Sequence, residues 1–278
     1  MITYPENVTC LADYIESVLT KFADRPAYTA LGQTLTFSEI DEKSSALARY
    51  LVNEAKLEPG SRVAIQLPNL IQNPIAVYAA LRAGLVVVNT NPLYTEREMK
   101  HQFTDSGATA LIILSDLLPK YDAIKSDTNI RTVIATSATE LLDPSTAPSI
   151  EGTVSLSSAI ETGAKTAEFK RPAVEKDELA MLQYTGGTTG VSKGAALSHN
   201  NVLANCIQML DRIGQQFKDG EEVVVCPLPL YHIYAFTVCM MALFSKGSQI
   251  VLIPNPRDID GFIQTLKPHS ITAFAGIN

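Results

Sequence analysis

The chain has 278 residues, of which 46% are hydrophobic and 18% are charged, and its formal net charge is −7. This length and composition are typical of one large globular domain or two ordinary ones. No cluster of lysine and arginine stands out, which excludes the basic surface that nucleic-acid-binding proteins present, so no nucleic-acid partner is expected.

The first part of the chain predicts two helices. Apolar residues at helical spacing between Leu11 and Phe22 predict the first one. The segment Thr36-Phe37-Ser38-Glu39 has the pattern of a capping box, in which the threonine hydroxyl accepts a hydrogen bond from the glutamate amide and the glutamate reaches back. A second helix is therefore expected to start at Thr36.

From residue 62 the chain alternates between short apolar runs and helical patterns. The runs predict strands at 62–67, 85–89, 109–114 and 131–135. Helices are predicted between them at 73–82, 95–107 and 116–125, the second of which opens on another capping box. Strands that alternate with helices imply a mostly parallel sheet with helices packed on it.

Residues 137–176 change character, because they are rich in Ser, Thr, Ala and Pro and show little periodicity. We interpret them as an irregular connection, with an N-terminal α/β subdomain over 1–175 and the start of a second one over 176–278. After this connection the alternation resumes, with strands predicted at 179–184, 222–226, 249–253 and 271–275 and helices at 200–212, 234–245 and 258–266. The fold class is therefore α/β, with mostly parallel sheets flanked by helices.

Two features bear on location. Residues 223–245 carry no formal charge, but Pro227 and Pro229 lie within them, so they are expected to form buried core rather than a membrane span. The N-terminus lacks the basic start and apolar segment of a signal peptide. We expect a cytoplasmic protein with reduced, mostly buried thiols and no protein-built metal site, because no zinc-like spacing involves Cys10, Cys206, Cys226 or Cys239.

The strongest chemical signal is the segment Tyr-Thr-Gly-Gly-Thr-Thr-Gly-Val-Ser-Lys-Gly over residues 184–194. Glycines let backbone amides approach phosphate oxygens closely, hydroxyls donate hydrogen bonds to them, and Lys193 supplies a mobile cation. A Gly/Thr-rich surface turn is the simpler interpretation, but it does not explain why all three groups follow one buried strand.

This segment is not the P-loop of NTPases, in which Gly-Lys-Ser/Thr opens a helix. Here Gly194 and a short apolar run follow Lys193, and a helix is expected only from Ser198. The loop is therefore predicted to join two strands as a hairpin-like flap.

The segment closely resembles the phosphate-binding signature of the adenylate-forming superfamily, which includes acyl-CoA synthetases, luciferases and adenylation domains of peptide synthetases. Residues 82–89 and 91–95 are similar to the upstream motif of that family, and Leu228-Pro229-Leu230-Tyr231-His232 is similar to its downstream element. The sequences of these motifs are most similar to those of bacterial long-chain fatty-acid–CoA ligases, and the resemblance covers nearly the whole chain.

The resemblance implies a fatty acid, ATP with Mg²⁺, and CoA as substrates. A carboxylate would attack the α-phosphate to give an acyl-adenylate, and the CoA thiol would then attack the acyl carbon, with no protein nucleophile. His232 would lie beside the reacting carboxylate, although a structural histidine is the alternative. By motif match, the β- and γ-phosphates would be held by Thr185, Gly186, Gly187, Thr188, Thr189, Gly190 and Lys193.

The family has further essential parts downstream, so we expect a truncated chain whose residues 1–278 are inactive alone. Three other interpretations stay open: activation of a shorter or aryl acid, a fatty acyl-AMP ligase that does not use CoA, and a noncatalytic nucleotide-binding module. Homodimer formation and peripheral contact with the inner membrane are also left open. Tyr231 and Tyr234 are candidates for the acyl tunnel or for plain core.

Overall fold

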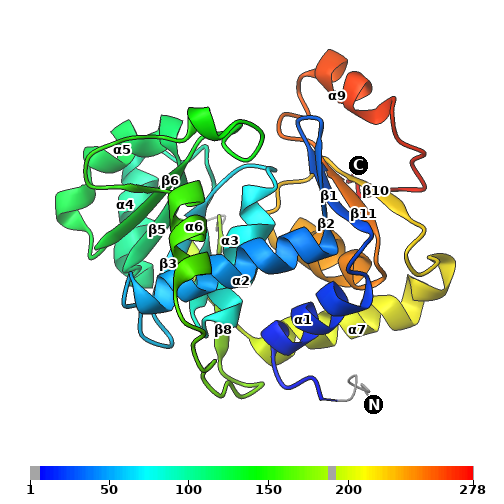
Figure 1. Ribbon diagram of the computed structural model, residues 1–278, viewed down its shortest axis with the longest axis horizontal. Helices are drawn as coiled ribbons and strands as arrows, with labels where there is room; N and C mark the ends of the chain where they lie inside the picture. The colour runs from blue at the N-terminus through cyan, green and yellow to red at the C-terminus, as the bar shows by residue number, and fades with distance from the viewer. Residues whose placement is uncertain (1–6, 187–191, 278) are drawn as a thin grey trace.

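The fold was analysed in a computed structural model that describes residues 7–186 and 192–277. Within these ranges the strands form a seven-stranded and a five-stranded sheet, seen at the left and right of Figure 1. The first sheet has the order β7-β6-β5-β3-β4-β8-β9 and is parallel except for β9, which runs antiparallel to β8. Its strands are β3 (Arg62–Gln66), β4 (Val86–Asn89), β5 (Ala110–Leu114), β6 (Thr132–Thr136), β7 (Val154–Ser155), β8 (Leu179–Thr185) and β9 (Lys193–Ser198).

The second sheet has the order β12-β10-β11-β1-β2 and is also parallel except at one edge, where β1 and β2 form a hairpin. Its strands are β1 (Pro26–Ala30), β2 (Gln33–Thr36), β10 (Val223–Cys226), β11 (Gln249–Leu252) and β12 (Ala273–Phe274). These two sheets, covered by helices, confirm the predicted α/β class with mostly parallel sheets.

The helices lie close to the predicted ranges. Helix α2 begins with the predicted capping box, since the Glu39 amide donates to the Thr36 hydroxyl and the Thr36 amide donates to the Glu39 carboxylate. The helices are α1 (Leu11–Lys21), α2 (Phe37–Asn53), α3 (Gln72–Arg82), α4 (Glu96–Ser106), α5 (Leu118–Asp122), α6 (Leu156–Lys165), α7 (His199–Ile213), α8 (Ile233–Ala235) and α9 (Ile259–Leu266). A π-helical segment (Phe236–Leu243) continues α8, and short 3₁₀ turns lie at Ser115–Leu117, Lys125–Asp127, Pro144–Thr146 and Gly214–Gln216.

The irregular connection predicted over 137–176 is wrong in part, because it contains β7 and the ten-residue helix α6. The Ser155 hydroxyl caps this helix by accepting from the Ser158 amide. Its buried face consists of Leu156, Ala159 and Gly163, spaced for one side of a helix and packed on α2. Because two of these three residues are small, the helical spacing of apolar residues was not recognised in a segment whose composition is typical of a loop.

The β1–β2 hairpin was not predicted from the sequence. Its two-residue loop consists of Leu31 and Gly32, both with positive φ (51° and 81°), between the paired residues Ala30 and Gln33. Two positive φ values are those of a type I′ turn, which favours Asn or Gly at its first position. Leucine there gives no turn signal.

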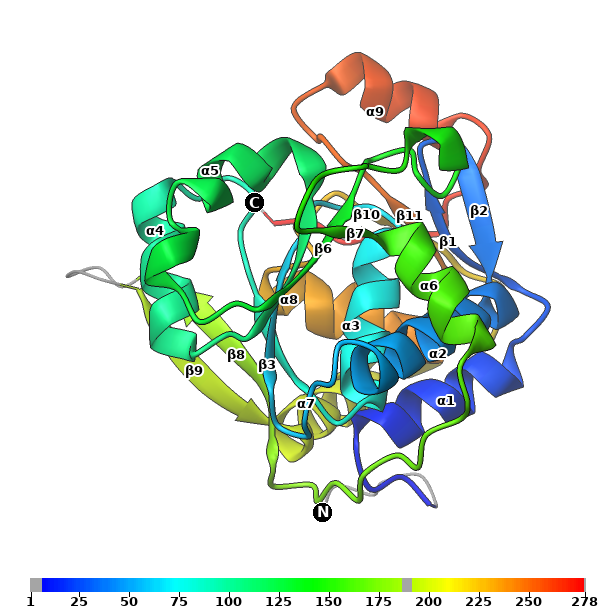
Figure 2. The ribbon, with the colours of Figure 1, turned by 60° about the vertical axis from the view of Figure 1, so that its left-hand side comes forward.

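The sheets do not divide at residue 176, where the sequence suggested a subdomain boundary. Strands β1 and β2 from the first segment join β10–β12, while β8 and β9 from the second segment join β3–β7. Helices α2 and α3 lie between the sheets in Figures 1 and 2.

The core between the sheets is aromatic. The Tyr28 hydroxyl of β1 and the Tyr78 hydroxyl of α3 share a hydrogen bond of 2.6 Å, and Tyr78 donates to the Met240 carbonyl at 2.7 Å. The Phe244 ring stacks on Tyr28 and on Phe37, with centroids 5.3 and 4.6 Å apart. These buried aromatic rings pack β1 of the five-stranded sheet against helices α2 and α3.

The uncharged stretch 223–245 forms β10, the turn with Pro227 and Pro229, α8 and the π-helical segment, most of it buried, as predicted. Over the ranges that the structure describes, we find no helix with the length and hydropathy needed to cross a membrane. The four cysteines are buried and free, as expected.

Candidate functional site

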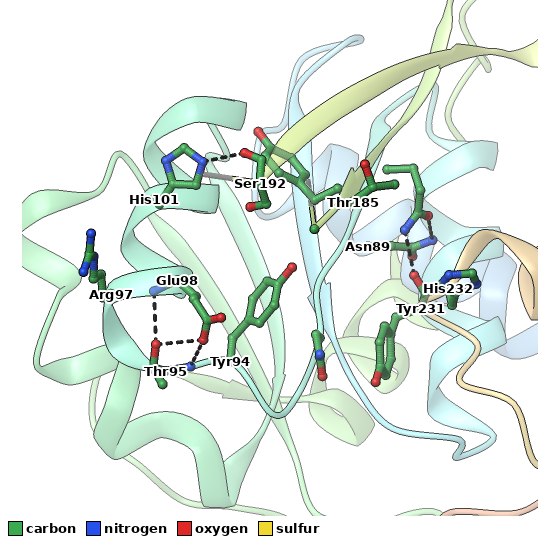
Figure 3. Close-up of a pocket in the computed structure, with 14 residues that line it drawn as sticks. Asn89, Tyr94, Thr95, Arg97, Glu98, His101, Thr185, Ser192, Tyr231 and His232 are labelled. Carbon is green, nitrogen blue, oxygen red and sulfur yellow. Dashed lines mark hydrogen bonds between the residues drawn. The ribbon is translucent and has the colours of Figure 1, made fainter. Parts of the chain in front are cut away.

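A cavity of about 940 Å³ opens where β4 and β8 end, between α4 and the turn that precedes α8 (Figure 3). The carboxyl ends of neighbouring parallel strands are where open α/β sheets bind ligands. The cavity is lined by Asn89, Asn91, Tyr94, Thr95, Arg97, Glu98, His101, Gln183, Tyr184, Thr185, Gly186, Ser192, Tyr231 and His232.

The predicted phosphate-binding segment borders this cavity at its described ends. Thr185 is the last residue of β8, Gly186 follows it, Ser192 precedes β9, and all three line the cavity. Thr185 pairs with Lys193 across the antiparallel ladder, which confirms that the segment joins two strands as a hairpin. The remaining predicted members lie outside the described residues: Gly187, Thr188, Thr189 and Gly190.

Lys193 is the first residue of β9, and it is exposed. It is not among the residues that line the cavity, but both the preceding Ser192 and its cross-strand partner Thr185 are. A lysine side chain is long and has four rotatable carbons, so its ammonium can reach past such neighbours.

His232 also lines the cavity, from the turn before α8. Its Nδ1 accepts a hydrogen bond from the Tyr234 amide at 3.3 Å. In a neutral imidazole one nitrogen accepts and the other carries the proton, so Nε2 is the donor here. The histidine can therefore offer an N–H to an anionic ligand.

The turn that carries His232 is fixed by side-chain amides. Asn69 accepts from the Leu230 amide and donates to the carbonyls of Cys226 and Leu228, at 2.9 to 3.1 Å. Gln183 donates to the Tyr231 carbonyl at 3.0 Å. Because Gln183 lies two residues before Thr185 on β8, one strand carries Thr185 and also holds the turn with His232 through Tyr231.

Asn89 and Gln183 form a buried pair that sequence reasoning missed. They are register partners near the ends of β4 and β8, and Asn89 Nδ2 donates to Gln183 Oε1 at 3.1 Å. Asn89 is 3% exposed, and its Oδ1 has no partner among the described residues. A polar residue that ends an otherwise β-branched run was the available signal, because such residues reach the ligand edge of a parallel sheet.

Helix α4 supplies residues of the cavity that sequence reasoning also missed. It opens with the predicted capping box, in which the Glu98 carboxylate accepts from the Thr95 amide and hydroxyl, each at 2.8 Å. These hydrogen bonds lower the pKa of Glu98. Arg97 and His101 line the same wall, so cationic and donor groups outnumber the one capping carboxylate there.

The two candidate tyrosines have different positions. Tyr231 borders both the main cavity and a smaller one of about 410 Å³, which is lined largely by prolines. Tyr234 is 42% exposed and borders neither of these cavities.

The acidic, histidine and cysteine side chains were also tested as metal ligands. Over 7–186 and 192–277, no group of three or more such residues could hold a metal ion. Glu98, which lines the cavity, already uses its carboxylate in the capping box. The described residues therefore offer no cluster that would hold a metal ion without help from a ligand.

Comparisons with known proteins agree on one family. The model of the family "AMP-binding enzyme" matches residues 15–278. A long-chain-fatty-acid–CoA ligase of Salmonella typhimurium is 39% identical over 99% of this chain and 52% of its own length. The corresponding ligase of Haemophilus influenzae is 38% identical over 96% of this chain and 51% of its length.

A solved structure has the same fold. The long-chain-fatty-acid–CoA ligase FadD1 of Archaeoglobus fulgidus superposes with a TM-score of 0.77 and 26% identity, over 91% of this chain and 48% of that one. The chain thus spans about half the length of the curated relatives and of the solved structure that it matches.

Proposed function

Because the chain belongs to the AMP-binding enzyme family, we propose that it supplies the triphosphate-binding part of an ATP-dependent long-chain fatty-acid–CoA ligase. One observation carries this proposal: the described ends of the Gly/Thr-rich segment and His232 line one cavity. A nucleotide tail and a carboxylate would meet there.

In the first half-reaction, a fatty-acid carboxylate oxygen attacks the α-phosphorus of ATP and the bond to the β-phosphate oxygen breaks, giving acyl-adenylate and pyrophosphate. The Thr185 hydroxyl, the Gly186 amide and the Lys193 ammonium would hold the β- and γ-phosphates. We include Gly187, Thr188, Thr189 and Gly190 in this role from the sequence motif alone. Catalysis by such groups consists of positioning and charge stabilisation.

The His232 Nε2–H would donate to the carboxylate and hold it in line for attack, since Nδ1 is occupied by the Tyr234 amide. In the second half-reaction the CoA thiolate attacks the acyl carbon and AMP leaves. We assign Mg²⁺ to the nucleotide itself, because the described residues offer it no site of their own.

The test is pyrophosphate release by the full-length protein that contains residues 1–278, called the full chain below, with acids from acetate to palmitate and with benzoate. We expect release to be fastest with long-chain acids and to be followed by CoA-dependent release of AMP. A maximum at short or aryl acids would favour the other acid classes, and pyrophosphate release without transfer to CoA would favour an acyl-AMP ligase. No release with any acid would leave a noncatalytic nucleotide-binding module.

We also propose a cytoplasmic enzyme that contacts the inner membrane peripherally and forms a homodimer. Exposed apolar side chains on α9, Ile259 at 59% and Ile263 at 49%, support an apolar contact of this kind. Sedimentation of the full chain with lipid vesicles and light scattering distinguish a membrane contact from a subunit contact.

A further inference from the structure

One face of α4 contacts both strands of the hairpin that carries the Gly/Thr-rich segment. Asp105 Oδ2 accepts from the Tyr184 hydroxyl of β8 at 2.6 Å. His101 Nε2 donates to the carbonyl of Ser192, next to β9, at 2.8 Å. Residues 101 and 105 are one helical turn apart, so both side chains leave the same face of the helix.

The Tyr184 ring ties the two strands together. Tyr184 pairs with Gly194 across the ladder, and a Cβ added at Gly194 would lie 2.9 Å from two carbons of the ring. Only glycine lets the ring lie across the neighbouring strand this closely. The His101 ring stands edge-on to the Tyr184 ring, with centroids 6.3 Å apart and an interplanar angle of 85°.

The Tyr184 hydroxyl stays a donor over the whole physiological range. The residue is 7% exposed, and burial together with the Asp105 hydrogen bond raises the pKa of Tyr184 well above its ordinary value. The contact is therefore a hydrogen bond from a neutral phenol to a carboxylate, which is stronger than one between neutral groups.

Helix α4 is itself fixed to the sheet. The Gln102 side chain donates from Nε2 to the backbone carbonyl of Asn89, at the end of β4, at 2.9 Å. Met99 and Phe103 are fully buried beneath the helix. The helix therefore links the hairpin to the end of β4, which borders the cavity.

We propose that His101 and Asp105 are positioning residues, which hold the two ends of the phosphate-binding segment at the cavity through Ser192 and Tyr184. This inference rests on the proposed function, because it assigns these residues to ATP binding. Misplacement of reacting groups by about 1 Å can cost ~100-fold in rate. Loss of either hydrogen bond at the base of the segment would therefore affect the reaction by shifting the groups that hold ATP.

The test compares variants of the full chain. His101→Leu, Asp105→Ala and Tyr184→Phe are each expected to raise KM for ATP about tenfold, with KM for the fatty acid changed less than about twofold. Since Asp105 and Tyr184 share one hydrogen bond, the KM for ATP of their double variant should be no higher than that of the more impaired single variant. His101→Gln keeps a donor near the position of Nε2 and should recover most of the loss.

Lys100→Ala is the matched control. Lys100 lies on the same helix but pairs with Asp127 at 2.8 Å on the exposed side, so this change should leave both KM values unaltered. Equal rises in both KM values, no rise at all, or additive effects of Asp105→Ala and Tyr184→Phe would overturn the proposal.

Hydrogen exchange gives a readout that does not need activity. Backbone amides at the C-terminal end of β8 and the N-terminal end of β9 should exchange faster in folded His101→Leu and Tyr184→Phe than in the parent protein. Their exchange rates should be unchanged in Lys100→Ala. Unaltered exchange in both of the first two variants would refute positioning. If the unsubstituted full chain makes no acyl-adenylate while exchange responds as expected, the enzyme assignment fails and the positioning contact stands.

Discussion

His232 shows how a neighbour can select the tautomer of a side chain. Its Nδ1 accepts from the Tyr234 amide, and in the neutral ring this contact leaves the proton on Nε2. In this tautomer, Nε2–H can donate a hydrogen bond to a carboxylate oxygen. Nothing in the turn sequence specifies this tautomer, because it depends on the geometry of a local amide.

Lys193 gives the sharpest prediction at the level of one residue. Replacing it by alanine in the full chain should slow acyl-adenylate formation by about 10- to 100-fold, because a cation for the leaving pyrophosphate is lost. Single-turnover pyrophosphate release measures this step. Lys193→Arg keeps the charge and should recover part of the rate.

The same Lys193→Ala variant should transfer a preformed acyl group to CoA normally, since pyrophosphate has already left by then. Unchanged adenylation in Lys193→Ala would remove this lysine from the mechanism.

Residues of the cavity that belong to a sequence motif could be predicted to lie near one another, whereas residues brought together by the fold alone could not. Thr185, Gly186 and His232 were expected at one site, and they do line one cavity. Asn89 and Gln183 were missed, because their partnership joins residues 94 positions apart. Such a pair exists only once β4 and β8 lie side by side, and periodicity carries no information on strand order.

At the level of elements, helix α6 shows how close packing can be hidden in a polar segment. Gly163 lies against α2, where a Cβ would come within 1.9 Å of the Ala46 carbonyl oxygen. The two helices can approach this closely because the residue has no side chain. The long helices and strands were predictable from their apolar periods, whereas α6 and the β1–β2 hairpin depend on small or untypical residues at tight contacts.

Gly163→Ala should therefore destabilise the protein by about 1–3 kcal/mol, as overpacking does in a well-packed interior. The sign is the informative part, because alanine in an open helix is more stable than glycine by about 1 kcal/mol. Urea unfolding measures the change. Thr162→Ala, at the exposed neighbouring position, should stay within about 0.5 kcal/mol of the parent, and a stabilised Gly163→Ala would contradict the close packing.

At the level of the whole molecule, contacts between distant segments hold the fold together. His199, at the start of α7, is 3% exposed, and its Nδ1 accepts from the Leu11 amide at the start of α1. Burial lowers the pKa of His199 to about 4. Protonation would place an N–H against another N–H, so this contact requires the neutral ring.

Stability should consequently depend on pH through His199. The folded pKa of about 4 lies below the unfolded value of about 6.5, so between these values the unfolded chain binds a proton that the folded chain does not. The contribution is complete above pH 6.5 and is lost as pH falls toward 4, at about 1.4 kcal/mol per pH unit. His199→Gln keeps an acceptor and does not titrate, so its unfolding free energy should change less between pH 6.5 and 4.5. Equal slopes for the two proteins would contradict this role.

The exchange of strands between the two sheets has a consequence for biosynthesis. Strand β1 pairs with β11, and the Gln249 side chain donates to Thr29 from 220 residues away. At a translation rate of 5–20 residues per second, β1 waits roughly 10 to 45 s for its partner to be made. During that interval the β1–β2 hairpin leaves the ribosome with the backbone N–H and C=O groups of β1 unpaired. Such an edge can pair with another chain and aggregate unless a chaperone binds it.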